Sequence, residues 1–148
     1  MTTRLYLTPA DRGRSLSLEE FESADAGEGY RYELVRGRLE VSPIPDLPHE
    51  RLVKWLGRLL EDYARRHPEV INEVFSPARV IIPDQEEGVS APEPDLACYH
   101  SFPTDLPLRE VNWCDVSPLL VVELRRRRLG QRGVVRQEGV IGLDGPPE

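Results

Sequence analysis

The longest regular pattern of apolar residues lies between residues 50 and 66, where apolar side chains recur at steps of three and four. This spacing places them along one side of an α-helix. The other side carries charged residues such as Arg51, Lys54 and Arg58, and Pro68 ends the pattern because proline cannot continue a helix. We predict a helix over residues 50–66 whose apolar face packs against a sheet. The side chains that this prediction buries are Leu52, Leu56, Leu59 and Tyr63.

The amino-terminal part predicts a short helix followed by a β-hairpin. Ser17 stands three residues before Glu20, which is the spacing of a capping box at the start of a helix. Two short runs, residues 30–34 and 39–42, flank a turn that contains Gly37. Because glycine adopts the backbone angles that tight turns need, these runs predict two antiparallel strands.

Four further segments have the short, apolar or β-branched composition of strands. They are residues 73–75, 78–82, 95–99 and 119–124. The last of them is apolar almost throughout, which predicts a strand buried at the centre of the sheet. Helix, hairpin, helix and strands follow one another in the chain, and this order predicts an α+β fold with a mixed β-sheet flanked by helices.

Length and composition narrow the class of protein. A chain of 148 residues predicts one domain, which we place at residues 1–124, followed by an arginine- and glycine-rich tail at 125–148. The net charge of −7 argues against a general nucleic-acid coat protein. No apolar run approaches the ~18 residues of a membrane helix, and the first residues do not form a signal peptide. We therefore expect a cytoplasmic protein without a membrane partner, whose Cys98 and Cys114 are reduced thiols.

Two carboxylates lie at the ends of predicted strands. Asp95 follows Glu93-Pro94 at the start of one strand, and Glu123 lies near the end of the apolar strand at residues 119–124. A carboxylate in a buried strand needs a partner, because burying a lone charge is costly. A Mg²⁺ ion, which prefers oxygen ligands, is one such partner. From spacing alone, a salt bridge or a solvated position explains acids at strand ends more often than a metal does.

The motifs taken together resemble a known family. Their order is Tyr32–Leu39, then His49 opening the amphipathic helix, then Glu93-Pro94-Asp95-Leu96, then Leu120–Glu123. This order is similar to that of Uma-two, a family of putative restriction endonucleases in the PD-(D/E)XK superfamily, over about residues 16–124. The resemblance implies a restriction-endonuclease-like fold and a phosphodiester hydrolase that acts on DNA with Mg²⁺ or Mn²⁺.

The resemblance also assigns roles by position. It makes Asp95 and Glu123 the metal-binding acids and Glu33 a further catalytic acid from the amino-terminal part. His49 matches a histidine that recurs in the family pattern, and the resemblance gives it no role. Arg125 stands two residues after Glu123, where the simplest form of the superfamily motif has a lysine.

The carboxyl end departs from the family pattern, because no lysine follows Lys54. Arg125 or Arg132 could orient a phosphate in place of that lysine, but arginine stays protonated and is a poor base. Two functions therefore stay open. One is a metal-dependent DNA endonuclease of reduced activity, and the other is a catalytically silent nuclease-fold domain that serves in binding or assembly. The shortened end also leaves a homodimer open.

Overall fold

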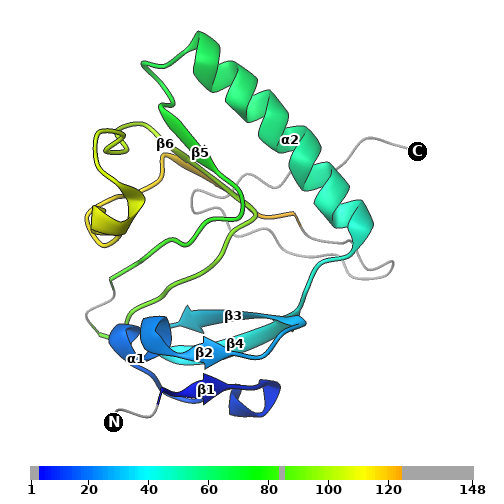
Figure 1. Ribbon diagram of the computed structural model, residues 1–148, viewed down its shortest axis with the longest axis vertical. Helices are drawn as coiled ribbons and strands as arrows, with labels where there is room; N and C mark the ends of the chain where they lie inside the picture. Colours follow the sequence, from blue (N-terminus) through cyan, green and yellow to red (C-terminus); the bar gives the residue numbers. More distant parts are fainter. Residues whose placement is uncertain (1–3, 84–85, 125–148) are drawn as a thin grey trace. The chain divides into compact units, whose positions relative to one another are not determined.

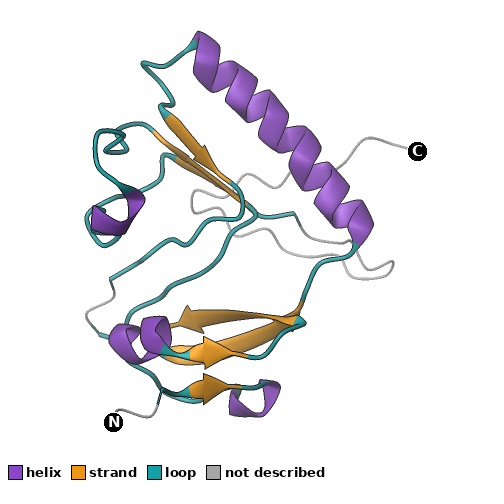
Figure 2. Cartoon of the chain, viewed as in Figure 1, coloured by secondary structure: helices purple, strands orange, loops and turns teal. Residues whose placement is uncertain are grey.

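The computed structural model describes residues 4–83 and 86–124, which fall into two compact units. The first unit combines Met1–Pro45 with Arg79–Glu93, and the second combines Asp46–Ala78 with the chain from Pro94 onward. Helices and strands follow each other as an α+β fold, so the predicted class is confirmed (Figures 1 and 2). The elements are β1 (Tyr6–Leu7), η1 (Pro9–Asp11), α1 (Leu18–Ser23), β2 (Asp25–Ala26), β3 (Tyr30–Val35), β4 (Arg38–Pro43), α2 (Leu47–Arg66), β5 (Glu73–Phe75), β6 (Leu96–Tyr99), η2 (Leu108–Glu110) and β7 (Leu120–Val122).

The predicted hairpin of the first unit is confirmed. Strands β3 and β4 pair antiparallel, and the two residues between them, Arg36 and Gly37, have φ angles of 49° and 72°. Two positive φ angles in a two-residue loop match the twist of the flanking strands. Leu34 and Leu39 face each other across the hairpin and are fully buried, so they form part of the core of this unit.

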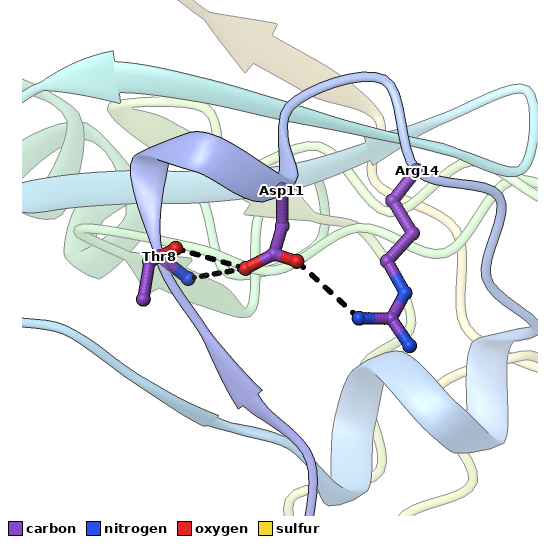
Figure 3. Close-up of polar contacts among 3 residues, drawn as sticks. All are labelled: Thr8, Asp11 and Arg14. Atoms are coloured by element: carbon purple, nitrogen blue, oxygen red, sulfur yellow. Dashed lines mark hydrogen bonds and ion pairs between the residues drawn. The ribbon is translucent and has the colours of Figure 1, made fainter.

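The two helical turns at the start of the first unit are held by carboxylates. Asp11 accepts hydrogen bonds from the backbone N–H of Thr8 at 2.9 Å and from its hydroxyl at 3.0 Å, and it forms an ion pair with Arg14 at 3.3 Å (Figure 3). The backbone hydrogen bond from Thr8, which favours the ionised form, contributes most to lowering the pKa of Asp11. The predicted capping box is also confirmed, because Ser17 and Glu20 exchange backbone-to-side-chain hydrogen bonds at the start of α1.

Residues 78–82 do not form a regular strand, so this prediction is wrong. Ile82 and Ser90 exchange two backbone hydrogen bonds, as antiparallel strands do, at 2.7 and 2.9 Å. Val80 donates to the carbonyl of Pro92 at 3.1 Å, but the return bond cannot form because proline has no N–H. The β-branched composition of the segment favours a strand, but Pro92 opposite it removes one of the two backbone hydrogen bonds that an antiparallel pair would form at Val80.

The second unit contains a three-stranded antiparallel sheet in the order β5-β6-β7. All four residues of β6 are buried, whereas Leu120 and Val121 of β7 are only half-buried. Within the described residues β7 lies at the edge of this sheet and β6 at its centre, so the predicted central position of residues 119–124 is wrong. β6 is buried because α2 and an aromatic cluster both contribute to covering it.

Helix α2 is longer at its start than its periodicity predicts. It begins at Leu47, because the side chain of Asp46 accepts the N–H of His49 at 3.1 Å and caps the first turn. Pro48 is tolerated there, since the first N–H groups of a helix have no partner within it. Across residues 4–83 and 86–124, no helix is both long and apolar enough to cross a membrane.

One side of α2 packs against the sheet of the second unit (Figure 1). Val53 and Leu56 join Leu96 and Val122 in one buried cluster. Leu59 and Tyr63 are 47% and 40% exposed, so the prediction that they are buried is wrong. The apolar arc of the helix is wider than the part of it that β5 and β6 contact. Leu52 is half-buried at the border of that arc.

An aromatic cluster packs around the end of β6 in the second unit. The rings of Phe75, Tyr99, Phe102 and Trp113 contact one another with centroids 5.0–5.8 Å apart. The amide of Asn72 exchanges two hydrogen bonds with the backbone of Phe102, at 2.8 and 2.9 Å. The loop that follows β6 is therefore fixed by ring packing and by one side-chain amide.

The packing of α2 leads to a first prediction. Leu56→Ala should lower the free energy of unfolding by about 2–5 kcal/mol, because Leu56 is 7% exposed and its truncation leaves a cavity. The matched substitution Leu59→Ala, on the exposed side of the same helix, should cost about 0.5 kcal/mol or less. Urea unfolding followed by circular dichroism measures both. Equal losses in the two variants would refute this assignment of the buried face.

A second prediction concerns the pH dependence that Asp11 contributes. A carboxyl whose pKa is lowered in the folded chain stabilises it above the ordinary value of 3.8, and this stabilisation is lost as the pH falls through the lower folded value. Asp11→Asn should therefore lower the thermal midpoint at pH 7, and the difference from the wild type should shrink below pH 3.8. Asp105→Asn, an exposed aspartate, is the control. A difference that stays constant down to pH 2 would contradict this explanation.

Candidate functional site

Asp95 is the one charged residue of the described chain that is almost completely buried, with 3% of its surface exposed. It directly precedes β6, and both of its carboxylate oxygens accept hydrogen bonds. Oδ1 lies 3.0 Å from Nε2 of His49, and Oδ2 accepts the backbone N–H of Leu124 at 2.8 Å. These contacts offset the cost of removing the charge from water.

His49 reaches Asp95 from the first turn of α2. Its backbone N–H is bound to the side chain of Asp46, and its ring is largely buried beside Asp95. An ionised carboxylate only accepts hydrogen bonds, so Nε2 carries the proton in this pair. The sequence suggested a residue at a helix start with no assigned role, and the structure shows that the same residue orients a buried carboxylate.

Glu123 directly follows β7, and β7 pairs with β6, the strand that Asp95 directly precedes. Leu96 pairs with Val122 in the register of β6 and β7, so Asp95 and Glu123 occupy the same end of neighbouring strands. Glu123 is exposed, in contrast to Asp95. Both residues flank their strands instead of lying within them. The convergence of the two carboxylates on one metal ion stays a prediction.

Glu33 is engaged within the first unit. Its Oε1 accepts the backbone N–H of Glu93 at 2.7 Å, while the carboxylate of Glu93 pairs with Arg79 at 2.9 Å. The guanidinium of Arg79 also lies 4.8 Å from the centre of the Phe21 ring. Glu33 thus helps to fix the backbone at Glu93. No sequence motif indicated Arg79, because its partners are distant along the chain.

The residues present can be compared with what a divalent metal requires. Among the described residues no cluster of three or more histidine, cysteine, aspartate or glutamate side chains could hold a metal ion. Mg²⁺ commonly uses only one or two carboxylates and completes its shell with waters and substrate phosphates. Asp95 and Glu123 both carry carboxylate oxygens, which are the ligands that Mg²⁺ prefers. Their binding of such an ion stays a prediction.

Comparison with known families adds to this geometry. The family model Uma2, described as a putative restriction endonuclease, matches residues 18–131, which is most of the chain. The chain belongs to the Uma2 family. None of the curated proteins compared with it matches the chain. The Uma2 match confirms the family resemblance and the restriction-endonuclease-like α+β fold that it implies.

The Uma2 match includes the candidate residues at the carboxyl end. It begins two residues later than the motifs suggest and extends past Glu123 to residue 131. Arg125 falls inside the match, while Arg132 falls one residue beyond it. Both lie outside the described residues, as does the proposed tail at 125–148, so their assignments stay predictions.

The two cysteines of this Uma2 protein have opposite surroundings. Cys98 lies in β6 and is completely buried, and this burial raises the pKa of its thiol to about 11. Cys114 is exposed, and neither forms a disulfide. A thiol reacts as its thiolate, so Cys98 is not a candidate nucleophile.

This contrast leads to a third prediction. At pH 8 a thiol reagent such as Ellman's reagent should modify Cys114 rapidly and leave Cys98 unmodified until the protein unfolds. The expected stoichiometry is one thiol in native protein and two in urea, and Cys114→Ser should leave none reactive in native protein. Rapid modification of Cys98 in folded Cys114→Ser would contradict the burial of β6.

Proposed function

We propose that this Uma2 protein is a divalent-metal-dependent DNA endonuclease of low activity, with Asp95 and Glu123 as its metal-binding residues. Membership of a family described as putative restriction endonucleases supports a nuclease, and DNA is the substrate that such a nuclease implies. The choice of metal, Mg²⁺ or Mn²⁺, rests on the carboxylate oxygens of the site.

The observation that carries this proposal is the environment of Asp95. A stability-driven sequence would place an apolar residue at a position that is 3% exposed, since a buried ion pair is seldom more stabilising than apolar packing. Here the position holds a carboxylate, kept in one orientation by His49 and by the N–H of Leu124. A fixed carboxylate at a strand end, with Glu123 at the same end of the next strand, supports metal binding by this pair.

Each residue then has a definite task. Asp95 and Glu123 supply oxygen ligands, and His49 holds Asp95 as a positioning residue. A bound metal ion would activate a water molecule and stabilise the charge that develops on the phosphoryl group. The low activity follows from Arg125 at the position two residues after Glu123, because arginine carries a permanent charge and cannot take a proton from water as a neutral lysine can.

A catalytically silent binding or assembly domain is the alternative. It is favoured by the two protein hydrogen bonds that Asp95 already accepts, which would hold its charge in the absence of any metal. The two functions differ in one measurable property, which is metal-dependent cleavage that requires both carboxylates.

A fourth prediction separates them. With supercoiled plasmid and Mg²⁺ or Mn²⁺, the wild type should nick DNA slowly, and Asp95→Asn or Glu123→Gln should reduce the rate about 100-fold or more. His49→Ala should reduce it about 10- to 100-fold, which is typical for residues that orient a metal ligand. Gel electrophoresis of time courses measures the rates, and calorimetric titration with Mn²⁺ measures binding independently of cleavage.

Glu110→Gln is the matched control, because Glu110 is an exposed glutamate on another element. It should cleave like the wild type. Equal background nicking by all of these proteins, together with no Mn²⁺ binding by the wild type, would establish the silent domain instead.

A further inference from the structure

The outward face of α2 carries basic side chains that form no ion pair with the rest of the described chain. Within the described residues, Arg51, Lys54 and Arg58 have no ion pair, side-chain hydrogen bond or ring contact. Every other described lysine or arginine has at least one such partner, from Arg4 with Asp25 to Arg109 with Glu110. Among residues 4–83 and 86–124, the unpaired cations thus lie on one face of one helix, in a chain whose net charge is −7.

An exposed indole lies among these cations. Trp55 is 52% exposed, and it stands four residues after Arg51 and three before Arg58, which are neighbouring positions on a helix surface. The other tryptophan, Trp113, belongs to the aromatic cluster of the second unit. Cations that contact a phosphate backbone, combined with an aromatic face on which a base stacks, are the usual components of a nucleic-acid surface.

The geometry points to Arg51, Lys54, Trp55 and Arg58 as a nucleic-acid-binding surface, which we call the α2 patch. Arg51 and Arg58 are about 10 Å apart along the helix axis, the axial rise of about three nucleotides. The patch begins two residues after His49, in the same unit as Asp95. This inference rests on the proposed function, for which it names the surface that holds the substrate.

A second copy of the chain is the competing occupant, since Leu59 and Tyr63 extend the exposed apolar residues beyond Trp55. In a symmetric dimer that pairs through the patch, the cations of one copy would face the cations of the other. Like charges across an interface are unfavourable. A polyanion neutralises the same charges. The α2 patch therefore fits DNA better than it fits itself.

The test is fluorescence anisotropy of a labelled 20-nucleotide DNA, single-stranded and duplex, with full-length protein in EDTA so that no cleavage occurs. The triple variant Arg51→Gln, Lys54→Gln and Arg58→Gln should bind roughly tenfold or more weakly at low salt. For this triple variant, the slope of the logarithm of the binding constant against the logarithm of the salt concentration should be shallower by about 3, which is one unit for each lost phosphate contact. Trp55→Ala should bind about tenfold more weakly, and Glu50→Gln, which removes a negative charge from the same helix, should bind more tightly.

The matched control is Arg4→Gln, Arg12→Gln and Arg109→Gln, which changes the net charge equally at exposed arginines that have partners. It should keep most of the affinity and the salt slope. Circular dichroism should show that each variant keeps its helix, since glutamine is nearly as good a helix former as arginine. Equal effects of the two triple variants, no effect of the patch variant, or no DNA binding by the wild type would overturn the inference. So would a wild-type dimer that Trp55→Ala dissociates without any change in DNA affinity.

The outcomes for the two proposals are separable. If DNA binding depends on the α2 patch while cleavage does not depend on Asp95, the patch stands and the endonuclease proposal fails. If cleavage depends on Asp95 while the patch variant binds and cleaves like the wild type, the endonuclease stands and the patch fails.

Discussion

Removing a carboxylate from water costs several kcal/mol unless the protein replaces the lost hydration. The second unit meets this requirement at Asp95 with a ring nitrogen from the first turn of α2 and a backbone N–H from the chain after β7. Three elements that are distant in sequence are thereby joined at one charge. Each of these two hydrogen bonds helps to orient the carboxylate, and the bond from His49 also ties the first turn of α2 to the start of β6.

The larger elements of the fold could be predicted because their signals are local. The spacing of apolar residues predicted α2, and the glycine in the turn predicted the hairpin of β3 and β4. The errors arose where the outcome depends on a distant partner. Periodicity defines the apolar arc of a helix but not how much of it a sheet covers, so Leu59 and Tyr63 were assigned to the core. Likewise, a proline twelve residues away decides whether Val80 belongs to a strand.

The candidate site shows the same division between local and distant signals. Strand-end positions and the family pattern selected Asp95 and Glu123 as candidates, and the register of β6 and β7 brings them to the same end of neighbouring strands. The contact between His49 and Asp95 spans 46 positions of sequence, and no local rule predicts it. Glu33 was expected from the family pattern to serve as an acid, and its carboxylate is seen holding the backbone of Glu93 within the first unit. The family pattern therefore named Glu33 as a candidate but did not predict which atoms it contacts.

The hydrogen bonds that Asp95 accepts from His49 and Leu124 also affect how readily each residue of the candidate site can be substituted during evolution. A single substitution of Asp95 would leave the donors on His49 and Leu124 without this acceptor, so it would cost stability unless its partners changed as well. Glu123 is exposed, and a substitution at an exposed position generally costs less stability than one at a buried position. If the proposed chemistry were lost in a lineage, we would therefore expect Glu123 to be replaced before Asp95.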